Sequence, residues 1–156
     1  MSSGPVVANS SPLIALGQIG HLQLLDGLFS TVVIPPAVAA EARPGLSLPP
    51  WVAERALAQP IGPQILRASL GRGESEAISL AIEADARWVI LDDRPARRLA
   101  QALGLPVIGT LGILLASKRK GLLPAVQPCL ESLTDHGFRI SPDLYDHILA
   151  DAGEGP

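Results

Sequence analysis

The chain has 156 residues, of which 47% are hydrophobic and 17% charged, and a net charge of −3 at pH 7. A chain of this length can bury enough surface to fold as one domain, so intrinsic disorder, collagen-like repeats and disulfide scaffolds are excluded. The single cysteine, Cys129, cannot form an internal bridge, and the acidic balance excludes the broad basic surface of non-specific nucleic-acid binders.

The first part of the chain predicts short apolar strands separated by helices. Residues 6–9 form an apolar run typical of a strand buried on both faces. A helix is expected to start at residues 10–12, because serine can cap a helix and proline is tolerated at its first position. Its apolar pattern continues, with interruptions, to Phe29. Residues 31–34 are all β-branched and predict a second strand, and a short helix follows over 35–42.

The rest of the chain begins with its least regular region. Residues 43–63 contain five of the fifteen prolines, so we expect a flap or rim there, with 51–58 compatible with a helix. Beyond it, helices are predicted over 74–85, 95–103, 111–120, 124–135 and 142–150. Strands are predicted over 87–91 and 105–108, with a last edge strand over 138–140.

Strands and helices alternate along the chain, which predicts an α/β fold with a parallel sheet covered on both faces. We expect residues 6–150 to form a single domain, between a disordered N-terminus at 1–5 and a flexible tail at 151–156.

Two features predict a cytoplasmic protein with no membrane partner. The N-terminus lacks the basic region and apolar core of a signal peptide. Residues 99–117 carry no charge and approach the length of a membrane span, but glycines and a proline interrupt them. We therefore interpret this stretch as part of the core.

Acidic or amide side chains stand at the expected ends of strands or near them. Ligands of open parallel sheets bind beyond the carboxyl ends of the strands. Carboxylates that converge there repel one another unless a divalent cation neutralises them, and a set of oxygen donors favours Mg²⁺ or Mn²⁺ over zinc. The side chains so placed are Asn9, Glu41, Glu74, Glu76, Asp92 and Asp93.

Each of these residues also has an ordinary structural interpretation. Glu74 and Glu76 would favour the dipole of a helix start, and Asp92 or Asp93 could cap the next helix. Asn9 is compatible with a turn, and Glu41 with an exposed helix face. Helical spacing places Glu74 nearer the apolar stripe than Glu76, but spacing alone does not decide which of the two faces the site.

Five motifs resemble a branch of the PIN-domain family similar to the VapC-type toxins of bacterial toxin–antitoxin pairs. They are residues 7–14, residues 33–38 with Glu41, residues 73–78, residues 91–94 with 96–97, and residues 109–112. The resemblance implies a three-layer α/β/α sandwich with a central parallel sheet of four to five strands. It also implies an acidic pocket for Mg²⁺ or Mn²⁺, cleavage of single-stranded or structured RNA, a homodimer, and a small antitoxin as partner.

The resemblance also assigns roles to single residues. The first family acid falls on Asn9, the second on Glu41, and the fourth on Asp93 with Asp92 beside it. The third falls on Glu76, with Glu74 as the alternative, and Ser11 matches the hydroxyl that orients the first acid. Most PIN nucleases have Asp where this chain has Asn9. A neutral oxygen still coordinates a hard cation but adds no charge, so metal affinity should fall.

The implied chemistry is metal-assisted hydrolysis of RNA. Glu41 and Asp93 would anchor the cation, Glu76 would hold a water or a second ion, and Arg94 and Arg97 would hold RNA phosphates. The alternative is a weakly active or inactive PIN-like module that binds protein or nucleic acid. Its apolar contact surface would come from residues 22–29 and 111–115.

Overall fold

The computed structural model describes residues 4–59 and 61–155. The strands in this part of the chain are β1 (Val6–Ala8), β2 (Val32–Ile34), β3 (Val52–Glu54), β4 (Trp88–Ile90) and β5 (Val107–Ile108). The helices are α1 (Ser10–Gln18), α2 (Leu24–Phe29), α3 (Pro36–Ala42), α4 (Ile61–Leu66), α5 (Arg72–Glu83), α6 (Arg94–Ala102), α7 (Thr110–Arg119), α8 (Gln127–Asp135) and α9 (Pro142–Asp151), with a 3-10 turn at Arg43–Gly45.

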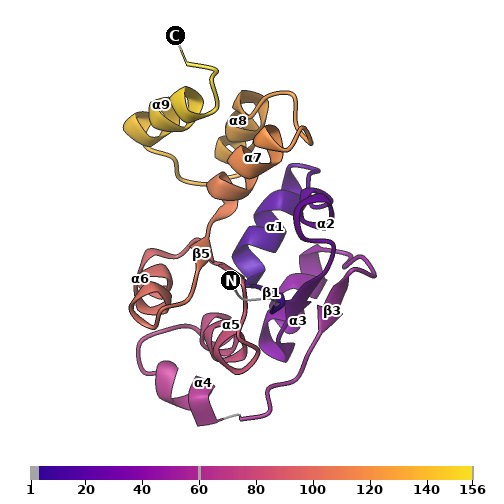
Figure 1. Cartoon of the computed structure of the whole chain (residues 1–156), viewed down its shortest axis with the longest axis vertical. Coiled ribbons are helices and arrows are strands. Elements are labelled where there is room, and N and C mark those ends of the chain that lie inside the picture. The colour runs from indigo at the N-terminus through magenta and orange to yellow at the C-terminus, as the bar shows by residue number, and fades with distance from the viewer. Residues whose placement is uncertain (1–3, 60, 156) are drawn as a thin grey trace.

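All five strands run parallel in the order β3-β2-β1-β4-β5. The central strand β1 is completely buried and lies between α1 and α5 (Figure 1). It pairs with β2 on one side and β4 on the other. Helices connect successive strands, as parallel pairing requires. The predicted α/β fold with a central parallel sheet is confirmed.

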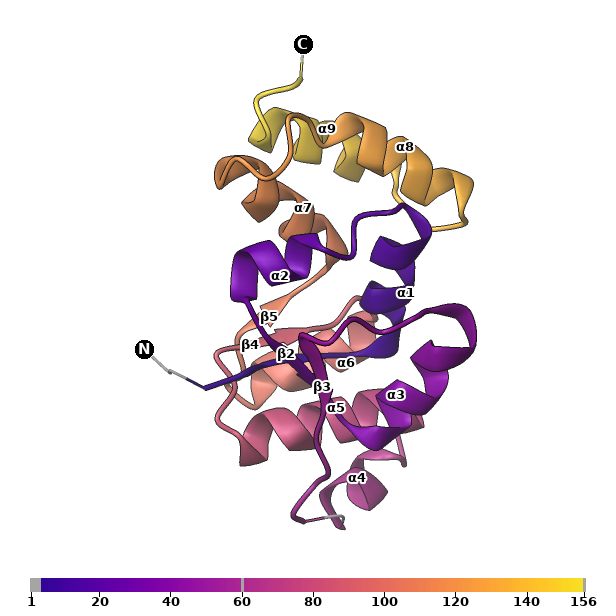
Figure 2. The ribbon, with the colours of Figure 1, turned by 90° about the vertical axis from the view of Figure 1, so that its right-hand side faces the viewer.

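Helices cover both faces of the sheet (Figure 2). Helices α1 and α2 lie on one side and α5 on the other, while α7 packs against α2, and α8 and α9 lie beyond α7. Fully buried side chains between these layers include Leu13, Leu16, Ile78, Leu91, Ile113, Leu114 and Leu130. Burial of each such side chain contributes about 1.5–3 kcal/mol, so this apolar core holds the layers together.

The irregular region after α3 contains the main difference from the predicted elements. The segment compatible with a helix over 51–58 contains the edge strand β3 instead, paired with β2 so that Val33 lies opposite Ala53. The free edge of β2 offers backbone hydrogen-bonding groups, and satisfying them outweighs the weak local preference of this segment. The short helix α4 was not predicted separately.

The edge strand predicted over 138–140 is wrong. The described part of the sheet ends at β5, and residues 138–140 connect α8 to α9 without strand pairing. Gly137 has a left-handed backbone, with φ at 91°, and ends α8 abruptly. Phe138 and Ile140 pack against the core, which explains their apolar character without a strand.

Both predicted chain ends carry contacts. Pro5 accepts a backbone hydrogen bond from Arg87, and residues 1–3 and 156 lie outside the described residues. Helix α9 continues one residue past the boundary expected at 150. The Glu154 carboxylate accepts hydrogen bonds from Lys118 Nζ at 2.8 Å and from the backbone of Val126 at 2.7 Å. These bonds join the expected tail to α7 and to the residue before α8.

No helix in residues 4–59 and 61–155 is long and apolar enough to span a membrane. The uncharged stretch 99–117 is divided among α6, β5 and α7.

Candidate metal centre

The carboxyl ends of β1 and β4 meet at the point where the strand order reverses, which is where open parallel sheets bind ligands. Asn9 follows β1 directly, and its backbone N–H donates to the carbonyl of Ile90 at 3.0 Å. This bond continues the pairing of the two strands past their ends. The turn with Asp92 and Asp93 therefore begins beside Asn9.

A cavity of about 280 Å³ opens at this edge. It is lined by Asn9, Ser10, Ser11, Glu41, Gly71, Gly73, Glu74 and Asp93. The amide and the three carboxylates come from four segments: the end of β1, α3, the first turn of α5, and the turn before α6. Folding thus brings together oxygen donors that are far apart in the sequence.

Asn9 is the most buried polar residue of this cavity, with 3% of its surface exposed. Among the described residues, its Oδ1 atom has no hydrogen-bond partner. An amide oxygen that is buried without a partner costs about 1–3 kcal/mol. An oxygen left in this state beside carboxylates fits a group that binds a hard cation.

Glu41 reaches the cavity from α3, which begins at the second residue of the proline pair at 35–36. Its Oε1 atom accepts a hydrogen bond from Ser10 Oγ at 3.0 Å. The carboxylate also lies against Gly73, where an added Cβ atom would overlap it. The absence of a side chain at Gly73 is therefore what lets the Glu41 carboxylate approach α5.

Glu74 and Asp93 complete the acidic wall. Glu74 Oε1 accepts from the backbone of Gly71 at 3.2 Å, and Asp93 Oδ2 accepts from the backbone of Ala96 at 3.1 Å as the cap of α6. Burial raises the pKa of Glu74, and the negative charge of Asp93 raises it further. The helix-cap interpretation of Asp93 is thus correct, and the same side chain also lines the cavity.

Glu76 does not take the place assigned to it. Its Oε1 atom accepts from the backbone of Ala37 at 2.9 Å, in the first turn of α3, and its Oε2 atom lies 3.7 Å from Arg72 Nε. Two residues of an α-helix are about 200° apart around its axis, so Glu74 and Glu76 point in different directions. The structure places Glu74 in the cavity, whereas Glu76 fastens α5 to α3.

Asp92 also lies outside the cavity, contrary to its expected role as a metal ligand. Its Oδ1 atom accepts from the Thr110 backbone at 2.7 Å and its Oδ2 atom from Thr110 Oγ1 at 2.6 Å. Burial raises the pKa of Asp92, and the bonds from Thr110 oppose this rise. The side chain anchors the start of α7 to the turn after β4.

Ser10, and not Ser11, donates the hydroxyl hydrogen bond to a carboxylate of the cavity. Ser11 was expected to orient Asn9, which stands at the position of the family's first acid, and Ser11 does line the cavity. The hydrogen bond to a carboxylate is made by Ser10 instead, and it holds the second acid, Glu41. Ser10 and the close approach at Gly73 were missed from the sequence, although both residues lie inside motifs that were singled out there.

A family model described as PIN domain matches residues 5–154. The chain belongs to the PIN-domain family. PIN domains are generally nucleases and generally use divalent metal ions. The chain is also similar to a solved PilT N-terminus domain protein of the hyperthermophilic archaeon Sulfolobus solfataricus P2, with 22% identity, a TM-score of 0.46, and coverage of 72% of this chain and 92% of that one. No curated protein matches the chain.

The acidic side chains of the cavity do not form a ready metal site. In the described part of the chain, no group of three or more His, Cys, Asp or Glu side chains is arranged to hold a metal. The donor set nevertheless fits Mg²⁺ or Mn²⁺, because the carboxylates and the unpartnered Asn9 oxygen are all hard ligands. Binding would therefore require the acidic side chains to rearrange.

Arg94 and Arg97, the expected phosphate contacts, line a different and larger cavity. Arg97 Nη1 donates to the carbonyl of Leu91 at 2.9 Å, so part of its guanidinium supports the turn after β4. Arg94 is exposed at the first position of α6, next to Asp93.

Proposed function

We propose that this PIN domain is a metal-dependent endoribonuclease that hydrolyses phosphodiester bonds of single-stranded RNA. The observation that carries the proposal is the buried Asn9 Oδ1 atom, which has no partner among the described residues and shares a cavity with three carboxylates. Buried polar atoms are almost always hydrogen-bonded, so an exception at the ligand-binding edge of a parallel sheet points to a bound group.

The amide and the three carboxylates of the cavity each have a proposed role. Glu41 and Asp93 would anchor Mg²⁺ or Mn²⁺, and Asn9 would add a neutral oxygen. Glu74 would take the role first assigned to Glu76, holding the attacking water, because its carboxylate lines the cavity beside Asp93. When bound, the cation would lower the pKa of water and stabilise the charge that develops on the phosphate.

Two further features of the proposal concern partners. We propose that the domain acts as the toxin of a toxin–antitoxin pair, with a small antitoxin protein as its inhibitor, and that it forms a homodimer. These assignments rest on the resemblance to VapC-type toxins.

A second candidate is a PIN module that binds RNA or protein with little or no catalysis. It is favoured by two observations: Asn9 contributes no charge where most PIN nucleases have Asp, and the described acidic side chains do not form a ready metal cage. The two candidates differ in whether the purified protein binds Mn²⁺ and cuts RNA.

The test uses Asp93→Asn with Asp143→Asn as its matched control. Asparagine caps helices as well as aspartate does, so Asp93→Asn retains the cap of α6 while removing a charge from the cavity. Asp143 is an exposed acid in the first turn of α9, outside the cavity. Both proteins are titrated with Mn²⁺ and incubated with labelled single-stranded RNA.

The wild type and Asp143→Asn should cut the RNA in Mn²⁺ and stop in EDTA. Asp93→Asn should remain folded and lose activity by a factor of about 100 or more, as expected when the surroundings of a metal are disturbed. Folded wild-type protein that neither binds Mn²⁺ nor cuts RNA would refute the nuclease and favour the binding module.

A further inference from the structure

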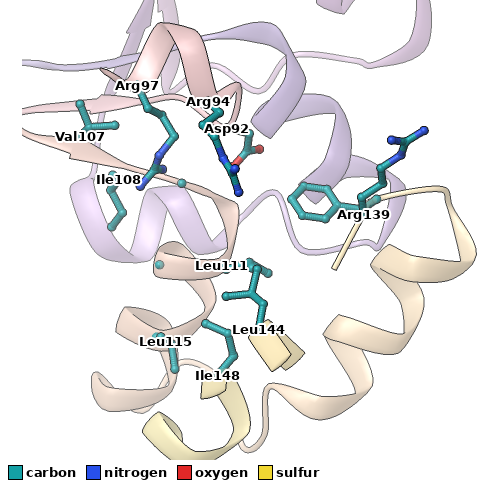
Figure 3. A pocket seen from close by; sticks show the side chains of 13 residues that line it. Asp92, Arg94, Arg97, Val107, Ile108, Leu111, Leu115, Arg139, Leu144 and Ile148 are labelled. Atoms are coloured by element: carbon teal, nitrogen blue, oxygen red, sulfur yellow. The ribbon is translucent and has the colours of Figure 1, made fainter. Parts of the chain in front are cut away.

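A large cavity of about 640 Å³ lies between the α6–β5 region and the C-terminal helices (Figure 3). Its lining comes from the turn after β4, from α6, β5, α7 and α9, and from the connection before α9. This volume falls within the range of small-molecule sites. The catalytic roles proposed above use none of its residues.

One side of this cavity is apolar and the other is basic. Leu111, Leu144 and Ile148 project into it from α7 and α9, and Arg94 and Arg97 extend toward them from α6 (Figure 3). Arg97 already donates to a backbone carbonyl. Arg94 has no ion-pair or hydrogen-bond partner among the described residues. The cavity therefore suits a ligand with an apolar face and an anionic group.

The position of the cavity restricts what that ligand can be. Asp92 lines the large cavity and Asp93 lines the acidic one. The two residues are consecutive, with Cα atoms about 3.8 Å apart, so the two cavities lie on either side of this turn. A chain with a phosphate at the acidic cavity would carry its neighbouring nucleotide past Arg94 and into the larger space.

We propose that the large cavity receives one unpaired nucleotide of RNA next to the phosphate that is cut. The base packs against Leu111 and Leu144, and the Arg94 guanidinium binds the adjacent phosphate. The inference rests on the proposed nuclease function, because that function places a phosphate at the acidic cavity. A base held in a duplex cannot turn its face into such a cavity, so the site selects single strands. An acidic peptide would match the arginines, but it has no reason to bind beside the acidic cavity.

Binding without metal tests this subsite independently of cleavage. Fluorescence polarisation in EDTA measures the affinity for short single-stranded RNA of mixed sequence, with the same RNA as a duplex and polyglutamate peptide as competitors. Arg94→Ala is compared with Arg98→Ala, because Arg98 is exposed on the same helix but does not line the cavity. Arg94→Ala should weaken RNA binding about fivefold, and the slope of log affinity against log salt should fall by about 0.7, the loss of one phosphate contact.

A second pair of variants tests the apolar wall. Leu144 and Leu122 are equally exposed, at 38% and 39%, but only Leu144 lines the cavity. Leu144→Glu should weaken the binding of single-stranded RNA about fivefold or more, because the new carboxylate faces the anionic ligand. Leu122→Glu carries the same charge change outside the cavity and should leave the affinity unchanged.

The outcomes separate the subsite from the nuclease. Equal losses in each variant and its control would refute the subsite, since the effect would then be general charge attraction. Stronger competition by polyglutamate or by duplex RNA than by the single strand would also overturn it. RNA binding that depends on Arg94 and Leu144, without any cleavage in Mn²⁺, would refute the nuclease and leave the subsite standing. Cleavage that is unaffected in Arg94→Ala and Leu144→Glu would refute the subsite and leave the nuclease standing.

Discussion

Glu74 and Glu76 lie in the same helix two residues apart, and the structure gives them separate tasks. Glu74 lines the acidic cavity, whereas Glu76 accepts a hydrogen bond from the Ala37 backbone at the start of α3. Substituting each by alanine should therefore produce opposite results. Glu76→Ala should destabilise the fold and leave Mn²⁺ binding intact, and Glu74→Ala should weaken Mn²⁺ binding at little loss of stability.

The expected loss for Glu76→Ala follows from its two contacts. A hydrogen bond between a backbone N–H and a carboxylate contributes about 1.5–3 kcal/mol. The contact with Arg72 spans 3.7 Å, and the Arg72 side chain is 68% exposed, so it adds at most about 0.5 kcal/mol. The free energy of unfolding should fall by about 2–3 kcal/mol. For a domain of this size each 1 kcal/mol lowers the melting temperature by about 2–4 °C, so a drop of roughly 4–12 °C is expected.

The Glu74 carboxylate shows the opposite balance. Burial and the charge of Asp93 raise its pKa, and only the bond from Gly71 favours the ionised form. Removing it relieves repulsion and loses one helix-cap contact, so the two effects offset each other.

Thermal melts in EDTA and Mn²⁺ titrations of both variants decide the matter. The assignment is refuted if Glu76→Ala loses Mn²⁺ affinity while Glu74→Ala keeps it. It is equally refuted if Glu76→Ala melts at the wild-type temperature.

Three further predictions concern the same cavity. Asn9→Asp should raise Mn²⁺ affinity about tenfold or more, which is about 1.4 kcal/mol of binding free energy. The same substitution should lower the free energy of unfolding in EDTA, because it adds a buried charge. Unchanged Mn²⁺ titrations would place Asn9 outside the coordination sphere. Gly73→Ala should displace the Glu41 carboxylate and weaken Mn²⁺ binding, although alanine favours the helix by up to about 1 kcal/mol; full Mn²⁺ affinity would show that the close approach is dispensable. In EDTA, the free energy of unfolding should fall as the pH rises through the raised pKa of Glu74, because the folded protein then binds more protons than the unfolded chain. Melts across this pH range with saturating Mn²⁺ should lose that trend, and a slope that Mn²⁺ does not change would separate Glu74 from the metal.

The sequence was sufficient to place the strand ends that carry the site. Buried parallel strands read as short apolar runs, so Asn9 and Asp93 could be assigned to the ends of β1 and β4. The proline pair at the start of α3 likewise indicated the helix that carries Glu41. These features depend on local sequence, and the structure agrees with them.

The choice between Glu74 and Glu76 depended on how α5 is rotated against α3, which spacing within one helix does not determine. A signal was present, because Glu74 shares a face with the buried Ala77 and Ile78. The family resemblance favoured Glu76, whereas the cavity is lined by Glu74. The strand β3 was missed for a related reason: it forms because β2 has a free edge, which is a property of the assembled sheet.

The neighbouring residues Asp92 and Asp93 have different tasks: Asp92 holds the start of α7, and Asp93 lines the acidic cavity. Successive side chains of an extended backbone point in opposite directions, so one faces Thr110 and the other faces the cavity. The turn that contains both residues is fixed further by Arg97, which donates to the Leu91 carbonyl.

The end of β1 is held in the same way, because Asn9 bonds to β4 through its backbone and is buried. The Asn9 side of the cavity is therefore preorganised. The Glu41 carboxylate accepts a hydrogen bond from Ser10, and the Glu74 carboxylate accepts one from Gly71. Since the described acidic groups do not yet form a metal cage, the rearrangement that a cation requires falls on these two longer side chains. Variants at Ser10 or Gly73 should accordingly affect metal affinity before they affect the fold.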